Sequence, residues 1–227
     1  MVNPNFNKDA YQQLLNSSTS KSVTINGKYN LSGWLLDYAG TNDLVIYFGG
    51  INEDASTAAL RIQEQQIRDK VYTGYDIAVV DWPQYGKSSG KATETSLKEA
   101  AVLITKYFSN KSDTGRIVII GYSMGTGPAV YAAAQTGCDG LILLSPYYNA
   151  NDLYNNVVNV FHGPFEILQS YKMPTNEFAV YVNVRPLIVA SRADKRVPYD
   201  SSARLSEVFE KGAILMTLEN TEHGDIP

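Results

Sequence analysis

Short apolar runs recur along the chain, and the stretches between them mostly carry apolar residues at helical spacing. The runs are typical of buried strands and lie at residues 44–48, 77–80, 117–120, 141–144, 186–190 and 214–218. Helical spacing is found at residues 55–71, 94–110, 126–134 and 201–211. Two further strands, 22–25 and 31–36, flank the turn Asn26-Gly27. This alternation predicts an α/β fold with a mostly parallel central sheet and helices on both faces.

Residues 147–183 depart from this alternation, because their pattern is irregular and rich in aromatic residues. We interpret them as a small cap inserted over the carboxyl edge of the sheet, within a single domain of residues 1–227. The aromatic rings of the cap either face a substrate or anchor the cap to the core. The pattern favours neither role over the other.

Composition and charge narrow the possible functions. The formal net charge is −4 and no basic stripe is present, so we expect no nucleic-acid binding. No apolar run reaches the roughly 18 residues of a membrane span, and the polar start of the chain does not resemble a signal peptide. The single cysteine, Cys138, excludes an internal disulfide and fits a cytoplasmic protein, unless a targeting segment has been removed. With one cysteine and two isolated histidines, we expect neither a metal site nor a cofactor.

The sequence Gly121-Tyr122-Ser123-Met124-Gly125 joins the strand at 117–120 to the helix at 126–134. In this setting, Gly-x-Ser-x-Gly forms a nucleophile elbow, a tight turn that exposes the serine Oγ. Gly121 and Gly125 carry no Cβ, so the backbones of strand and helix can approach each other there. We therefore identify Ser123 as a candidate nucleophile; the alternative is an ordinary turn between strand and helix.

A serine nucleophile requires a general base and a carboxylate that orients it. His223 directly follows the last predicted strand, whereas the other histidine, His162, lies in the predicted cap and is better explained by packing or surface exposure. Asp194 follows the strand at 186–190 and is the better acid candidate than Asp81, Asp200 or Asp225. The order Ser123, Asp194, His223 is the one that this type of elbow predicts.

The oxyanion of a tetrahedral intermediate requires two N–H donors. One donor is expected from Met124, the residue after the nucleophile, and the other from Ile51 in the Gly49-Gly50-Ile51 loop. The alternative is that these glycines merely end a strand. We also expect four residues in this loop, the 81–90 loop and the cap to contact the substrate: Gly50, Tyr85, Tyr147 and Phe161.

Several stretches together resemble an α/β-hydrolase, most closely the Bem46-like serine hydrolases related to prolyl oligopeptidase. The matching stretches are Tyr47-Phe48-Gly49-Gly50, Asp81-Trp82-Pro83-Gln84-Tyr85-Gly86-Lys87-Ser88-Ser89-Gly90, the Gly121–Gly125 elbow, Asp194 with Val197-Pro198, and Glu222-His223. The resemblance covers about residues 22–226 and implies an α/β-hydrolase fold.

Two features differ from the family pattern. Many relatives carry His-Gly where this chain has Gly49-Gly50, but the donor there is a backbone group and its function does not depend on the side chain. Relatives usually have a helix after the histidine, whereas His223 lies four residues before Pro227. We therefore expect either another part of the chain or residues that follow Pro227 to hold this loop in place.

These observations lead to one main hypothesis and two alternatives. The chain is expected to be a serine hydrolase that cleaves a small carboxylic ester or thioester through an acyl-enzyme on Ser123. The alternatives are an acyltransferase that uses the same residues and a non-catalytic binding protein with this fold. The acyl length and the oligomeric state are left open.

Overall fold

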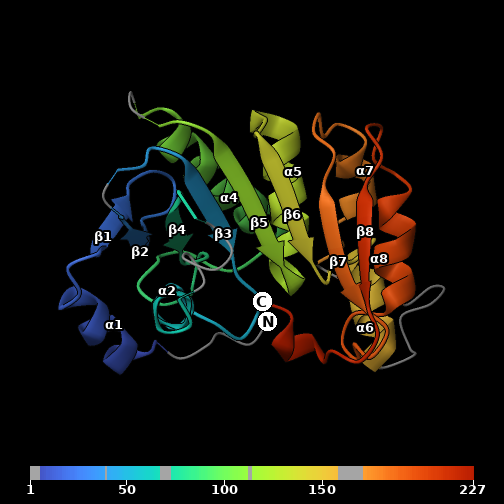
Figure 1. Cartoon of the computed structure of the whole chain (residues 1–227), viewed down its shortest axis with the longest axis horizontal. Helices are drawn as coiled ribbons and strands as arrows, with labels where there is room; N and C mark the ends of the chain where they lie inside the picture. The colour runs from blue at the N-terminus through green and yellow to red at the C-terminus, as the bar shows by residue number, and fades with distance from the viewer. Residues whose placement is uncertain (1–5, 39, 67–72, 112–113, 158–170) are drawn as a thin grey trace.

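The computed structural model describes residues 6–38, 40–66, 73–111, 114–157 and 171–227. At its centre is an eight-stranded sheet with the order β1-β2-β4-β3-β5-β6-β7-β8 (Figure 1). The strands are β1 Ser20–Ile25, β2 Leu31–Leu36, β3 Leu44–Phe48, β4 Asp76–Val80, β5 Ile117–Tyr122, β6 Gly140–Leu144, β7 Leu187–Ser191 and β8 Ile214–Leu218. Each predicted strand therefore exists, with ends shifted by at most a few residues.

From β4 to β8 the neighbouring strands are parallel, while β2 pairs antiparallel with both β1 and β4. The register brings the carboxyl ends of the parallel strands to one edge, since Phe48 pairs with Gly121 and Tyr122 with Leu144. Loops that follow these strands therefore meet at this edge, where open parallel sheets bind ligands.

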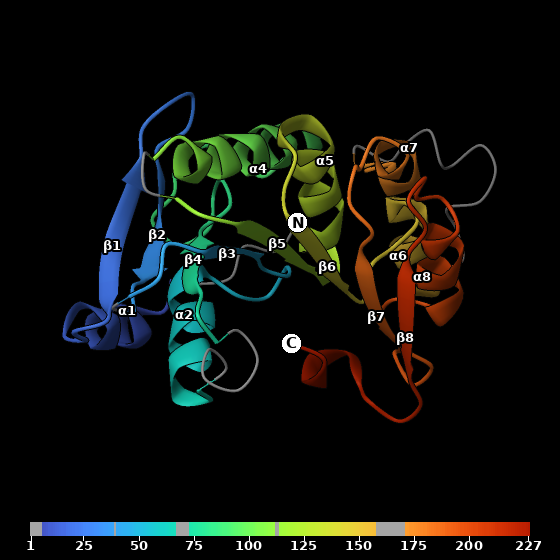
Figure 2. The same cartoon turned by 45° about the horizontal axis from the view of Figure 1, so that its top comes forward.

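Helices cover both faces of the sheet (Figure 2). On one face, α1 Lys8–Leu15 and α2 Ala55–Glu64 bury Leu14 and Ile62 against β2, β3 and β4. On the other face lie α4 Glu94–Ser109, α5 Thr126–Thr136 and α8 Tyr199–Ser206, whose apolar sides join one large core cluster. The predicted α/β fold with a mostly parallel, doubly covered sheet is confirmed.

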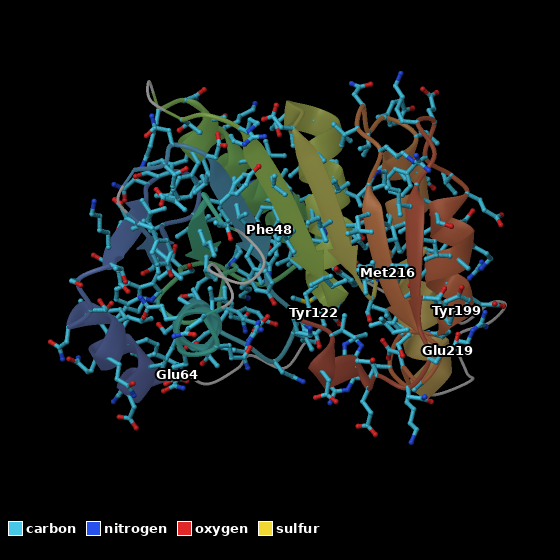
Figure 3. The ribbon with its side chains drawn as sticks, viewed as in Figure 1. Phe48, Glu64, Tyr122, Tyr199, Met216 and Glu219 are labelled. Atoms are coloured by element: carbon cyan, nitrogen blue, oxygen red, sulfur yellow. The ribbon has the colours of Figure 1, made fainter. Side chains whose placement is uncertain are left out.

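Three details differ from the sequence-based expectations. The polar start of the chain, where no element was expected, forms α1. Asn7 caps its first turn, and Ala10 and Leu14 supply a buried side. Helix α8 begins earlier and ends earlier than expected, and Asp200 lies in its first turn. Strand β8 forms the sheet edge, and Met216 lies on it (Figure 3). Ile214 and Met216 are about half exposed, at 48% and 49%.

The region predicted as a cap is described on both sides of residues 158–170, which lie outside the described part of the chain. It contains α6 Ala150–Val157 and α7 Thr175–Ala179, and α7 packs against α5. Tyr147 and Tyr171 are buried in the main core. For these two rings, the anchoring role is therefore the one that the structure supports.

A buried carboxylate, Asp81, sits at the amino end of α2. It accepts a hydrogen bond from the Ala55 N–H at 2.6 Å and a weaker one from the Lys87 N–H at 3.4 Å. Burial raises the pKa of Asp81 to about 7, and the neighbouring Asp54 also raises it, while the two N–H groups lower it. The native state therefore holds this proton more tightly than the unfolded chain does.

This raised pKa predicts a pH-dependent stability. The contribution of Asp81 is fully present below its ordinary pKa near 4 and is lost as the pH rises toward about 7. We expect Asp81→Asn to reduce the fall in the free energy of unfolding between pH 5 and pH 7, as measured by urea unfolding. Asp200, an exposed carboxylate in the first turn of α8, provides a control. Asp200→Asn should keep the wild-type change in the free energy of unfolding with pH. An unchanged slope in Asp81→Asn would contradict this account.

Candidate active site

Ser123 stands at the turn between β5 and α5, as the first residue of the short 3-10 helix Ser123–Gly125. Its φ angle is 51°, in the left-handed region that non-glycine residues rarely adopt. The turn also brings α5 close to the end of β3: a Cβ added at Gly125 would lie 2.2 Å from the carbonyl oxygen of Phe48. Added at Gly121, it would lie 2.7 Å from the Cα of Thr126. Both glycines of the motif are thus required by close backbone approach.

Three predicted side chains meet above this turn. His223 Nε2 lies 2.9 Å from Ser123 Oγ, and His223 Nδ1 lies 2.7 Å from Asp194 Oδ2. Because an ionised carboxylate can only accept, Nδ1 carries the proton shared with Asp194, and Nε2 is left to accept from the serine hydroxyl. Asp194 and His223 are buried, with exposed fractions of 8% and 5%, whereas Ser123 is partly exposed.

The Asp194 carboxylate is satisfied from both sides. Its Oδ1 accepts the N–H groups of Arg196 and Val197 at 2.8 and 2.9 Å, and its Oδ2 accepts the Ser145 hydroxyl at 2.8 Å. Burial raises the pKa of Asp194, but the hydrogen bonds from His223, Val197 and Ser145 outweigh it and leave the pKa below its ordinary value. Asp194 is therefore ionised at neutral pH and can fix the orientation of the imidazole.

Tyr122 holds the loop that carries His223. Its hydroxyl donates to the carbonyl oxygen of His223 at 2.9 Å, and the two rings lie 5.2 Å apart between centroids. Figure 3 shows Tyr122 at the carboxyl end of β5, beside the C-terminal segment. Another part of the chain, the end of β5, therefore helps to hold the His223 loop, which was one of the two expected supports.

Three side chains fix the Gly49-Gly50-Ile51 loop beside the elbow. Trp82 Nε1 donates to the Gly49 carbonyl at 3.1 Å, and the Tyr85 hydroxyl donates to the Ile51 carbonyl at 3.2 Å. From the other side, Glu53 Oε1 accepts the Gly50 N–H at 3.2 Å. Both carbonyl oxygens are thereby turned toward the protein, while the Ile51 and Met124 N–H groups remain the predicted oxyanion donors.

A cavity of about 300 Å³ opens at this edge of the sheet. Gly50, Ile51, Tyr122, Ser123 and His223 are among its lining residues. It is therefore the candidate substrate pocket. A second cavity of about 340 Å³ lies at the opposite edge, and its lining includes Lys21, Asp37 and Asp76 but none of the candidate residues.

Two of the residues expected to contact a substrate lie elsewhere. Tyr85 and Tyr147 are almost fully buried and do not line this cavity. Tyr147 packs behind the elbow, where its hydroxyl donates to the carbonyl of Met124 at 3.1 Å. Both expectations were wrong, because an aromatic residue in a loop can point into the core as readily as into a pocket. Gly50 lines the cavity as expected, and Phe161 lies outside the described residues.

Sequence reasoning missed several supporting residues. Ser145 directly follows β6 and contacts Asp194, and a polar residue just after a strand was the available signal. Tyr122 and Trp82 stand within the recognised motifs, but their contacts are with segments distant in sequence. The contact of Glu53 with the Gly50 N–H is local, but no motif marked it. Within the part of the chain that the structure describes, no group of three or more His, Cys, Asp and Glu side chains could hold a metal ion. Nor does any helix there have the length and apolar character needed to cross a bilayer.

The parallel sheet and its serine elbow define the class of protein, an α/β-hydrolase. Residues 43–174 match the family model described as the alpha/beta hydrolase fold, and the chain belongs to this family. Among curated proteins, human Protein ABHD12B is 25% identical over 183 residues, which is 74% of this chain. The chain spans about half the length of that relative, because the match covers 50% of it.

Solved structures with the same fold include an esterase and a protein with ferulic acid bound. The Pyrococcus furiosus esterase Pf2001 superimposes with a TM-score of 0.75 at 18% identity, covering 99% of this chain and 90% of that one. Est1E from Butyrivibrio proteoclasticus, with ferulic acid bound, gives a TM-score of 0.69 at 18% identity, covering 88% and 90%. These likenesses establish the fold, and family membership supports a hydrolase.

The contact between Tyr122 and the His223 loop predicts a local loss of stability on mutation. Tyr122→Phe keeps the ring but removes a hydrogen bond worth about 1 kcal/mol. We expect backbone amides of residues 222–226 to exchange about fivefold faster with deuterium. Tyr199→Phe is the matched control, since its hydroxyl lies 2.8 Å from Thr217 Oγ1, away from the pocket. Equal exchange in Tyr122→Phe and wild type would rule out this anchoring role.

Proposed function

We propose that the protein is a serine hydrolase that cleaves a carboxylic ester or thioester through an acyl-enzyme on Ser123. The observation that carries the proposal is the continuous chain of contacts from Ser123 Oγ to His223 and from His223 to Asp194, at 2.9 and 2.7 Å. Such a chain is the arrangement that activates a serine for acyl transfer.

In the first step, His223 Nε2 takes the proton of the Ser123 hydroxyl as Oγ attacks the acyl carbon. The carbonyl π bond breaks and places negative charge on its oxygen. The N–H groups of Ile51 and Met124 hold this oxyanion, aided by the position of Ser123 at the amino end of α5. Asp194 stabilises the imidazolium that forms, because its charge lies against Nδ1.

In the second step, the tetrahedral intermediate collapses and the bond to the leaving oxygen or sulfur breaks. His223 returns the proton to that leaving group, and the acyl group remains on Ser123 Oγ. Water then repeats the sequence: His223 removes its proton, the oxyanion forms again, and Ser123 leaves with the proton from His223. The products are a carboxylic acid and an alcohol or thiol.

Two further observations support this assignment over the alternatives. The base and acid are buried and oriented by several hydrogen bonds, which favours a catalytic site over a non-catalytic binding protein. The fold likeness to a protein described as an esterase favours an ester substrate. Water is the simplest acceptor for the acyl group, and no described feature of the pocket singles out an alcohol or thiol acceptor.

The central test is covalent labelling of Ser123. We expect a fluorophosphonate to form one adduct, mapped to Ser123 by peptide mass spectrometry, and wild-type protein to release p-nitrophenol from p-nitrophenyl esters. Ser123→Ala should lose labelling and lower kcat by on the order of 10⁶-fold, with the fold retained by circular dichroism. Ester turnover by Ser123→Ala at the wild-type rate would refute the mechanism.

The two histidines offer a matched comparison for the base. His223→Asn should abolish labelling, because Nε2 is the group that activates the serine. His162→Asn should label at the wild-type rate, since His162 is not assigned to the site. Equal loss in both variants would argue against His223 as the base.

Asp194 provides a separate test of orientation. Asp194→Asn keeps the shape of the side chain but presents an uncharged group to His223 Nδ1. We expect kcat to fall by roughly 10⁴-fold, as for a triad whose histidine is held in the wrong tautomer. A kinetic comparison on one p-nitrophenyl ester is sufficient. A loss of less than tenfold would show that Asp194 does not orient the base.

A further inference from the structure

The candidate substrate pocket contains charged groups of both signs in its wall. Glu53 and Arg61 line it and form an ion pair at 3.3 Å, with exposed side-chain fractions of 14% and 23%. The Tyr47 hydroxyl donates to Glu53 Oε1 at 2.7 Å. The same hydroxyl oxygen of Tyr47 accepts a hydrogen bond from the Arg61 guanidinium at 3.1 Å. These charges compensate each other within the wall, so neither is free for a ligand.

Arg196 lines the same pocket and differs from Arg61. Its backbone is fixed, because its N–H donates to Asp194 Oδ1 at 2.8 Å and Val197 beside it is buried. Its side chain is exposed, and no ion pair or hydrogen bond with another described residue engages its guanidinium group. A fixed backbone thus places in the pocket lining a cation for which the described residues supply no ion-pair partner.

Two carboxylates at the pocket, those of Asp194 and Glu53, already have partners. Asp194 accepts four hydrogen bonds and lies buried behind His223, while Glu53 is paired with Arg61. A guanidinium group presents parallel N–H donors that match the two oxygens of a carboxylate. The charge of one carboxylate would balance the one free cation among the described lining residues.

We infer that the substrate of this site is an ester that carries a separate carboxylate group, which Arg196 binds while the ester carbonyl lies at Ser123. The inference rests on the proposed function, because it places the reacting carbonyl at the serine. It makes the proposed function more specific by assigning the substrate class, an anionic ester in place of a purely apolar one. Arg196 acts in substrate binding and takes no part in the proton transfers.

The first experiment compares matched esters with and without the charge. On the acyl side, p-nitrophenyl hemiadipate is compared with its neutral terminal amide; on the leaving-group side, 4-acetoxybenzoate is compared with 4-acetoxybenzamide. For each pair, the measured quantity is the ratio of kcat/KM for the charged ester to that for the neutral one. We expect Arg196→Gln to lower this ratio by about tenfold for at least one pair. Arg196→Lys should lower it less, since the charge remains but the fork is lost.

The same loop supplies the control. Arg192 is also exposed, but its Nε lies 3.4 Å from Glu219 Oε1, its guanidinium stacks over Tyr199, and it does not line the pocket. Arg192→Gln changes the net charge equally and should keep the wild-type ratio. Raising NaCl from about 0.02 to about 0.5 M should lower the ratio in the wild type and have less effect in Arg196→Gln. Equal ratios in Arg196→Gln and wild type for both pairs would overturn the inference.

A binding measurement separates this inference from the proposed function. Monomethyl adipate and 4-acetoxybenzoate are titrated calorimetrically into Ser123→Ala and into the double variant with Arg196→Gln. We expect at least one of them to bind Ser123→Ala, with a Kd about tenfold weaker in the double variant. Absence of ester turnover in the wild type would refute the proposed function alone. Equal Kd values, or no binding of either ligand to Ser123→Ala, would refute the role of Arg196.

Discussion

Asp194 is a buried carboxylate whose charge is held by four hydrogen bonds from three parts of the chain. The donors are Ser145 at the end of β6, the N–H groups of Arg196 and Val197 in its own loop, and His223 after β8. An ionised carboxylate without such partners would be costly to bury. The charge therefore ties the carboxyl ends of β6, β7 and β8 together, and the position of His223 over Ser123 depends on this arrangement.

The main elements of the fold were predictable because each depends on a local pattern. Continuous apolar runs mark strands buried on both faces, and Gly-x-Ser-x-Gly between a strand and a helix marks the elbow. Asp194 and His223 could be proposed because they directly follow strands, and parallel strands end at one edge. The exposure of β8 was not predictable, since an apolar run looks the same in an edge strand with Ile214 and Met216 half exposed.

The supports of the site could not be predicted, because they are contacts between segments distant in sequence. Tyr85 and Tyr147 were expected in the pocket, yet each is buried and donates to a backbone carbonyl of the loop or turn that it underlies. Sequence identifies an aromatic residue in a loop but not the direction of its ring. Likewise, Arg61 and Arg196 look alike in sequence; only the structure separates the paired cation from the free one.

Tyr122 and Ser123 are neighbours in the chain, and this has a mechanical consequence. Ser123 carries the nucleophile, and Tyr122 before it holds the backbone of the base through the carbonyl of His223. A small displacement of the end of β5 would therefore move both partners in the same direction. The distance between Ser123 Oγ and His223 Nε2 is in this way kept nearly constant when the sheet moves, although Ser123 and His223 lie 100 positions apart in sequence.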